Sequence, residues 1–248
     1  MKILLIRPNR NEADAAALAE FGIETGIDPY LAISQVNNVL GAQKMLDALR
    51  SKNEKWLILT SSNGLQYWQN LLDPGELEKV VFESESIQFA AIGQQTRRQL
   101  FALGANEVAV ADRFDSASLA ETLSGGNPIP VVIPAGSIAM QTLDNSLSGL
   151  GFDVISEVVY QTNPVVTSPN SVGQIAAGVF DAVLLRSPSA ARTFLSMNPS
   201  PRLSIICGGN TTAKAVQSLG VKPDLISADP SPEAIAKAVS AYFLDRRN

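Results

Sequence analysis

The chain has 248 residues, 46% hydrophobic and 17% charged, the composition of a globular protein long enough for one large domain or two ordinary ones. Its formal net charge of −5 argues against binding nucleic acid through bulk electrostatics. The chain has no histidine, which excludes the triad of serine hydrolases and most zinc or iron sites, so we expect no metal and no cofactor.

The first ten residues are not typical of a targeting segment. Their apolar run, 3–6, ends at Arg7 and Pro8 and is too short for the core of a signal peptide. No later run approaches the length needed to cross a membrane. The lone cysteine, Cys207, cannot form an intramolecular disulfide, which favours a reducing compartment. We therefore expect a cytoplasmic protein with no membrane partner.

Short apolar segments alternate with amphipathic ones along the chain. The segments expected to form strands are 2–6, 56–59, 88–92, 130–133, 154–160, 182–185 and 204–206. Helices are expected at 12–21, from about 63, at 94–103 before Gly104, and from Pro232, with Ser231 as its cap. This alternation predicts an α/β fold with mainly parallel sheets, in which sites form at the loops after the strands.

Two stretches of sequence recur in the same order. The segment 60–68 resembles 186–194, because each has a polar start containing serine and an aromatic residue near its end. The segment 91–96 resembles 206–211, and each is followed by a helical pattern that ends in Leu-Gly. Two related α/β domains are the simplest explanation.

Each repeat places two polar loops between a strand and a helix. The loop residues that we expect to bind a ligand are Ser61, Ser62, Asn63, Gly93, Thr96, Ser187, Ser189, Gly208 and Thr211. Free amide groups and the dipole at the start of a helix favour a carboxylate or a phosphate. Taken singly, each loop is more simply an ordinary helix cap. The four loops together predict a cleft between domains that binds a polyanion through neutral donors.

Several side chains near these loops allow two interpretations. Arg7, which follows the first strand, either meets an anion or pairs with a surface carboxylate, and Arg186 and Arg192 carry the same ambiguity. Tyr160 either donates its phenolic proton into a cleft or is a half-buried aromatic residue of a strand. Cys207 is more often a packing residue than a nucleophile at such a position.

A nucleotide site at Gly208 and Gly209 is disfavoured. The chain lacks the phosphate-loop pattern and has no G-x-G-x-x-G after its first strand.

These segments together resemble the uroporphyrinogen-III synthase family over nearly the whole chain. The matching pieces are 6–8, 60–63 with Trp68, 91–96, 159–162, 187–190 with Phe194, and 208–213. Each motif is short, but their joint order and spacing are specific. The chain departs from the family at Ala135-Gly136, where many members have an arginine before the glycine. It also departs at Arg186, where threonine is usual, and at Cys207, where an aliphatic residue is common.

The resemblance implies a two-domain architecture. One domain would combine 1–32 with 163–248, and the other would be the middle, 35–160. Two extended strands, 30–34 and 159–162, would join the domains as a two-stranded linker, and the active site would lie in the interdomain cleft.

The resemblance also implies a reaction. The substrate would be hydroxymethylbilane, a linear tetrapyrrole with eight carboxylates. It would lose water and close with inversion of its terminal ring to give uroporphyrinogen III, a step of haem biosynthesis catalysed by a cyclising hydro-lyase. Tyr160 would assist the departing hydroxyl as a weak general acid, while Arg7 and the loop residues would bind carboxylates.

The alternative is a non-catalytic ligand-binding protein of the same two-domain fold. It would share the helix-start anion sites, and the missing arginine at Ala135-Gly136 would then reflect lost activity. In either case we expect a small-molecule tetrapyrrole or similar ligand, no nucleic-acid partner, and a monomer.

Overall fold

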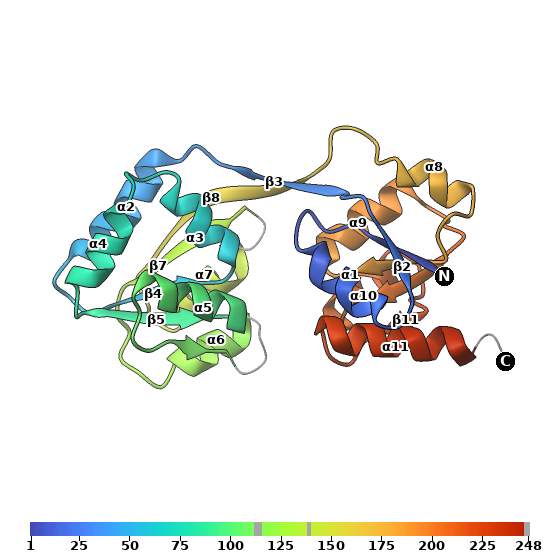
Figure 1. Ribbon diagram of the computed structural model, residues 1–248. Helices are drawn as coiled ribbons and strands as arrows, with labels where there is room; N and C mark the ends of the chain where they lie inside the picture. The colour runs from blue at the N-terminus through green and yellow to red at the C-terminus, as the bar shows by residue number, and fades with distance from the viewer. Residues whose placement is uncertain (112–115, 138–139, 246–248) are drawn as a thin grey trace. The chain divides into compact units, whose positions relative to one another are not determined.

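A computed structural model describes residues 1–111, 116–137 and 140–245. The chain divides into two compact units (Figure 1). The terminal unit combines Met1–Ala32 with Asn163–Asn248, and the middle unit is Ile33–Thr162. The chain therefore passes between the units twice.

The terminal unit contains a five-stranded sheet and its helices. In chain order the elements are β1 (Lys2–Leu5), α1 (Asn11–Ala19), β2 (Glu24–Ile27), α8 (Ser171–Ala176), β9 (Ala182–Leu185), α9 (Pro188–Met197), β10 (Ser204–Cys207), α10 (Asn210–Ser218), β11 (Leu225–Ile226) and α11 (Pro232–Asp245). The strand order is β11-β10-β9-β1-β2, and every neighbouring pair is parallel.

The middle unit contains a six-stranded sheet. Its elements are β3 (Leu31–Gln35), α2 (Val39–Arg50), β4 (Lys55–Leu59), α3 (Ser62–Gln69), α4 (Glu76–Glu83), β5 (Ile87–Ala91), α5 (Gln94–Leu103), β6 (Ala109–Val110), α6 (Ser116–Leu123), β7 (Val131–Gly136), α7 (Met140–Gly149) and β8 (Val154–Pro164). The strand order is β3-β8-β7-β4-β5-β6, parallel from β8 to β6. The predicted α/β class with mainly parallel sheets is confirmed.

The two sheets share one topology with a shifted starting point. In the middle unit the chain forms β4, β5 and β6 toward one edge and then β7 and β8 toward the other. In the terminal unit β9, β10 and β11 take the first three places, while β1 and β2, from the opposite end of the sequence, take the last two. The internal repeat predicted from the sequence thus corresponds to two units related by a circular shift.

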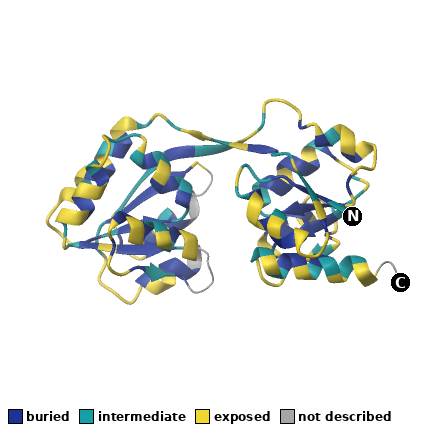
Figure 2. Cartoon of the chain, viewed as in Figure 1, coloured by how far each residue is buried: buried dark blue, intermediate teal, exposed yellow. Residues whose placement is uncertain are grey.

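Each sheet is buried on both faces, as expected for parallel strands covered by helices (Figure 2). Along β1, Leu4 belongs to one apolar cluster and Ile3 and Leu5 to another. Along β4, Leu57 and Leu59 belong to one cluster and Ile58 to the other. Each unit therefore has its own core on both sides of its sheet.

The elements that the sequence did not indicate include the edge strands β2, β6 and β11 and the helix pair α2 and α4. β2 is a short edge strand with no fully buried residue, and β6 and β11 have two residues each, so their apolar patterns are weak. β7 continues to Gly136, beyond the expected end at Ile133, because Pro134 stays in the ladder opposite Glu157.

Candidate functional site

The chain reverses its direction of sheet growth between β9 and β1 in the terminal unit. In open parallel sheets, ligands bind beyond the carboxyl ends of the strands at such a reversal. The loop after β1 supplies Arg7, and the loop after β9 supplies Arg186 and Ser187. The fold therefore brings the candidate Arg7 and one predicted polar loop of the terminal unit, far apart in sequence, to one switch point.

Arg7 and Arg186 share one carboxylate at this switch point. Arg7 Nη1 lies 3.6 Å from Asp14 Oδ2, and Arg186 Nη1 lies 3.2 Å from Asp14 Oδ1. The Asp14 side chain is only 2% exposed, whereas Arg186 and Arg7 are 16% and 27% exposed. The surface carboxylate considered as a partner for Arg7 is thus a buried one, on the first turn of α1.

Burial dominates the electrostatics of this group. Loss of hydration raises the pKa of the Asp14 carboxyl, although Arg186 and Arg7 act in the opposite direction. Burial also lowers the pKa of the Arg186 guanidinium, against the effect of Asp14. Desolvation therefore outweighs attraction for both partners, as is common for buried ion pairs.

Gly208 makes room for Arg186. A Cβ atom at position 208 would lie 2.9 Å from Arg186 Cδ and 3.4 Å from Ile235 Cδ1. The stem of Arg186 thus crosses the backbone after β10. Gly208 acts here through its small size, which allows this close approach.

Tyr160 lies at the corresponding edge of the middle unit. A register shift at Ala135/Gly136 places Tyr160 opposite Gly136, and Val159 and Tyr160 are both buried in the same apolar cluster. A bulge of this kind redirects a side chain. The ring covers Gly136 so closely that a Cβ there would lie 2.4 Å from Tyr160 Cζ, and it stacks on Tyr67 of α3 at 5.8 Å.

The Tyr160 side chain is 8% exposed, so it is more buried than the half-buried strand residue that the spacing suggested. Its hydroxyl end lies beside Gly136, because a Cβ at that glycine would be 2.7 Å from the Tyr160 oxygen. The phenol is therefore held in one place at the carboxyl end of β7 by a glycine and a second tyrosine.

Two of the four polar loops cap their own helices. Ser61 Oγ accepts a hydrogen bond from the Asn63 amide at 3.2 Å, at the start of α3. Ser187 Oγ accepts one from the Ala190 amide at 3.2 Å and lies 3.1 Å from Ser189 Oγ, at the start of α9. Ser62 is buried. These two loops match the ordinary-cap interpretation, with their hydroxyls already engaged within the helix start.

The other two loops start their helices at glycine. Gly93 precedes α5 and Gly209 precedes α10, and neither helix has a side-chain hydrogen bond at this cap. A Cβ at either glycine would meet nothing within 4 Å. Thr96 is buried in the first turn of α5, and Thr211 is exposed in the first turn of α10. These two helix starts therefore leave space for a ligand next to backbone amides.

Cys207 is a packing residue. Its side chain is 0% exposed at the end of β10, and burial raises the pKa of the thiol to about 11. A thiol in this state is a poor nucleophile near neutral pH.

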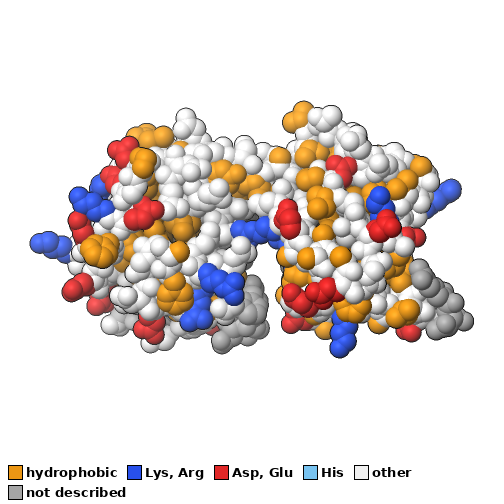
Figure 3. Space-filling model, in the orientation of Figure 1, with side chains coloured by type: hydrophobic (Ala, Val, Ile, Leu, Met, Phe, Trp, Pro, Cys, Tyr) orange, Lys and Arg blue, Asp and Glu red, His pale blue; other side chains and the backbone are white. Residues whose placement is uncertain are grey.

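Within residues 1–111, 116–137 and 140–245, no three Asp, Glu, Cys or His side chains are grouped as metal ligands. None of the helices in the described part of the chain is long and apolar enough to cross a membrane. Acidic and basic side chains are interspersed on the visible face of each unit (Figure 3), so an anion would be held by local groups.

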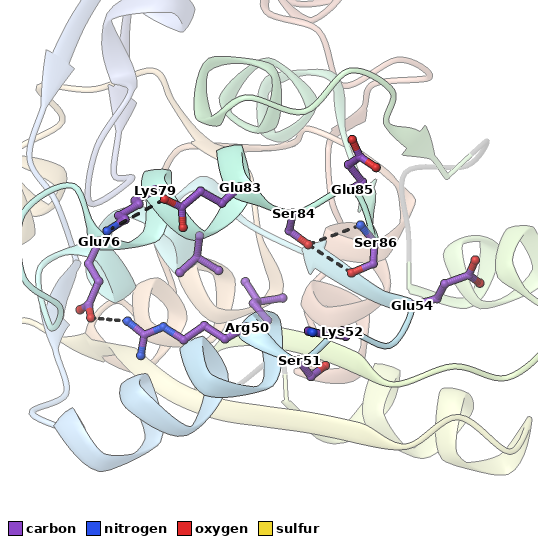
Figure 4. A pocket seen from close by; sticks show the side chains of 12 residues that line it. Arg50, Ser51, Lys52, Glu54, Glu76, Lys79, Glu83, Ser84, Glu85 and Ser86 are labelled. Carbon is purple, nitrogen blue, oxygen red and sulfur yellow. Dashed lines mark hydrogen bonds and ion pairs between the residues drawn. The ribbon is translucent and has the colours of Figure 1, made fainter.

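A hollow of the middle unit lies at the end of the sheet opposite to the polar loops of that unit. It has a volume of about 940 Å³ and is lined by the end of α2 and by α4 and the residues that follow it, at the amino edge of β4 and β5 (Figure 4). Arg50 pairs with Glu76 at 2.5 Å on its wall, and Lys79 faces Glu83 at 4.0 Å. Acidic residues outnumber basic ones on this wall, which disfavours a polyanionic ligand there.

A family model described as uroporphyrinogen-III synthase HemD matches residues 12–237 of the chain. The chain belongs to the uroporphyrinogen-III synthase family. Among curated relatives of this synthase family, the porphyrin biosynthesis protein HemD of Ruminiclostridium josui is 26% identical over 89% of the chain. The match covers 44% of that longer protein. The uroporphyrinogen-III synthase of Chlorobaculum parvum is 24% identical over 96% of the chain and 97% of its own length.

Solved structures of uroporphyrinogen-III synthases share the fold. A mutant enzyme from Thermus thermophilus has a TM-score of 0.68 at 18% identity, covering 99% of both chains. The Helicobacter pylori protein has a TM-score of 0.64 at 18% identity, covering 97% of this chain and 98% of its own. At this identity the likeness establishes the fold alone.

Three residues that contact predicted site residues were not identified from the sequence of this synthase-family chain. Asp14 looks like an ordinary acidic residue in a first helical turn, where the dipole favours it. Tyr67 and Gly136 matter through their contacts with Tyr160. Of these three residues, only Gly136 could have been noticed in the sequence, because it belongs to the Ala135-Gly136 pair at which the chain departs from the family.

Proposed function

We propose that the protein converts hydroxymethylbilane into uroporphyrinogen III, with loss of water and inversion of the terminal ring. This makes it a cyclising hydro-lyase of tetrapyrrole biosynthesis. The family match across residues 12–237 carries the proposal. The geometry adds anion-accepting groups at the carboxyl edges of both sheets, which suit a substrate with eight carboxylates.

Positioning is the main contribution of the protein to this reaction. The unassisted substrate closes without inversion, so the catalyst must favour one geometry rather than supply a strong acid or base. The open helix starts at Gly93 and Gly209 offer amides to carboxylates, and Thr96 and Thr211 stand beside them. We propose that loops of both units contact the substrate.

Tyr160 is the proposed weak general acid for the departing hydroxyl. Tyr67 and Gly136 fix its ring at the strand end, so the phenol needs little reorganisation to meet a bound substrate. Loss of the hydroxyl gives an azafulvene, which the far terminal ring attacks to form a spiro intermediate. That intermediate fragments and recloses with the ring inverted.

The activity is tested by incubating purified protein with fresh hydroxymethylbilane, oxidising the products and separating the isomers by chromatography. We expect predominantly type III product above the level of the protein-free control. Type I product alone, from folded protein, would reject the synthase function and favour a non-catalytic tetrapyrrole-binding protein.

The role of Tyr160 is tested by Tyr160→Phe. We expect kcat to fall by about 100-fold, the lower end of the range for general acid catalysis, with an unchanged melting temperature. Tyr67→Phe is the matched control, because it removes a phenol but keeps the stacked ring. Equal kcat for wild type and Tyr160→Phe would remove Tyr160 from the mechanism.

Carboxylate binding at the start of α10 is tested by Thr211→Ala. The exposed hydroxyl is not needed for packing, so the variant should fold normally and bind product more weakly in calorimetry.

We further propose a monomeric, cytoplasmic enzyme, and light scattering should return the mass of one chain.

A further inference from the structure

The group of Arg7, Asp14 and Arg186 has an unusual distribution of exposure. Asp14 is 2% exposed and cannot reach a ligand, whereas both arginines extend to the surface from its two oxygens. Two positive charges face one negative charge, which leaves the three side chains with an excess of one positive charge. The group is thus suited to accept an anion from the solvent side.

Hydrogen bonding within the group is incomplete. Both Asp14 oxygens and Arg186 Nη1 are buried without a hydrogen-bond partner, because their ion-pair contacts do not have hydrogen-bond geometry. A buried ion pair lacking good hydrogen bonds contributes little to stability. Its presence at a switch point is better explained by a ligand that binds the part of each arginine that stays exposed.

The surroundings hold both arginines in place. Asn11 Nδ2 donates to the Arg7 carbonyl at 2.9 Å, which fixes the backbone of that loop. Gly208 accommodates the stem of Arg186. Guanidinium groups bind carboxylates through paired N–H donors, so their orientation decides the affinity.

We propose that Arg7 and Arg186 form a carboxylate-binding pair of the terminal unit and that Asp14 is the positioning residue that orients them. The identification of the ligand as one carboxylate of the tetrapyrrole rests on the proposed function. The pair itself, as a site for carboxylates, rests on the contacts of these three side chains.

The first test measures binding of uroporphyrin III, an octacarboxylate, by its fluorescence. Arg186→Gln should raise the Kd and the KM for hydroxymethylbilane by about 10- to 100-fold, the effect of one charged hydrogen-bonded contact, with little change in kcat. Arg202→Gln is the matched control, because Arg202 is an exposed arginine before β10, at the opposite edge of the sheet. An equal Kd for Arg186→Gln and wild type would overturn the proposal.

The second test separates positioning from simple electrostatics. Asp14→Asn removes the one negative charge of the group and so raises its net charge by one; electrostatics alone therefore predicts a lower Kd for uroporphyrin. Positioning predicts a higher Kd, about 10-fold, because the arginines lose their common anchor. The control is Asp224→Asn, whose carboxylate accepts from the Ile205 amide at 2.8 Å at the amino edge of the sheet. An unchanged or lower Kd in Asp14→Asn would exclude the positioning role.

A variant without a charge change guards against a folding artefact. Gly208→Ala should displace Arg186 through the contact at its Cδ and raise the Kd like Arg186→Gln. Circular dichroism and the melting temperature of each variant establish that it is folded.

The third test does not depend on the tetrapyrrole. Succinate, a simple dicarboxylate, should raise the melting temperature of the wild type above that in sodium chloride of equal ionic strength, and should not do so in Arg186→Gln. If the protein shows this shift but makes no type III product, the shift supports the arginine pair and the missing product rejects the synthase function. Equal shifts in the two proteins, or none in either, would reject the pair as a carboxylate site whatever the activity.

Discussion

Cys207 ends β10 at the edge of the sheet where the loops gather, yet its thiol faces the core. Burial raises its pKa from 9.0 to about 11, because the thiolate would lose its hydration. The residue next to a candidate site is therefore chemically silent, and the contact with Arg186 is made at the glycine that follows it.

This burial predicts low reactivity and a defined pH dependence. A disulfide-exchange reagent should label the native protein slowly at pH 8 and the urea-unfolded protein at once. The folded state favours the protonated thiol, so the contribution of Cys207 to stability is complete below pH 9 and is lost as the pH rises toward about 11. Cys207→Ala should remove this component of the alkaline loss, and rapid labelling of native protein would contradict the assignment.

Gly136 shows how one missing side chain fixes another. Gly136→Ala should force the Tyr160 ring out of its place, since the new Cβ would lie 2.4 Å from Cζ. Overpacking of this kind costs about 1–3 kcal/mol of unfolding free energy, and we expect turnover to fall with it. Gly149→Ala, at the end of α7, is the control for glycine loss, because nothing lies within 4 Å of its new Cβ. Full activity in Gly136→Ala would show that the position of the ring is unimportant.

At the scale of elements, a buried lysine of β4 caps the C-terminal end of helix α2. Lys55 is 1% exposed, and its Nζ donates to the Leu49 carbonyl at 3.2 Å and to the Ser51 carbonyl. A cation near the C-terminus of a helix also interacts favourably with the negative end of the helix dipole. The first residue of β4 thus stabilises the end of the helix before it.

Lys55→Met should therefore destabilise the middle unit by about 1.5–3 kcal/mol, the value of hydrogen bonds from a charged donor. Trp56 and Trp68 both belong to the middle unit, so tryptophan emission during urea unfolding reports on this unit. Lys52→Met, at an exposed position three residues earlier, should leave the midpoint unchanged. Equal midpoints for both variants would show that Lys55 does not stabilise the helix.

At the scale of the whole molecule, the chain builds the same order of five parallel strands twice, and β3 adds a sixth strand to the middle unit. The middle unit is continuous in sequence, while the terminal unit is assembled from the two ends of the chain. Each unit has apolar clusters on both faces of its sheet. The middle unit therefore has the size and the core of an independent domain.

The excised segment 33–162 should fold without the terminal unit. We expect a cooperative urea transition in tryptophan emission, with a midpoint close to that of the full chain. Emission typical of exposed tryptophan in the absence of urea would show that this unit needs the rest of the protein.

Much of this architecture could be predicted because it depends on local pattern. The apolar alternation marked the buried strands, Gly104 marked the end of α5, and Ser231 with Pro232 marked the start of α11. The edge strands β2, β6 and β11 were missed because a strand of two to four partly exposed residues has too short a pattern. For the site, sequence order predicted the four polar loops, since each directly follows a buried strand.

The sequence by itself determined the fold class, the internal repeat and the resemblance to one family, because these depend on periodicity and on the order of motifs along the chain. Only the tertiary structure decided that Asp14 joins Arg7 to Arg186 and that Tyr160 lies on Gly136. The physical reason is that strands distant in sequence become neighbours in a parallel sheet, so the partners of a side chain at its edge come from other loops. Which hydroxyls serve as caps and which helix starts stay open was likewise decided by three-dimensional contacts.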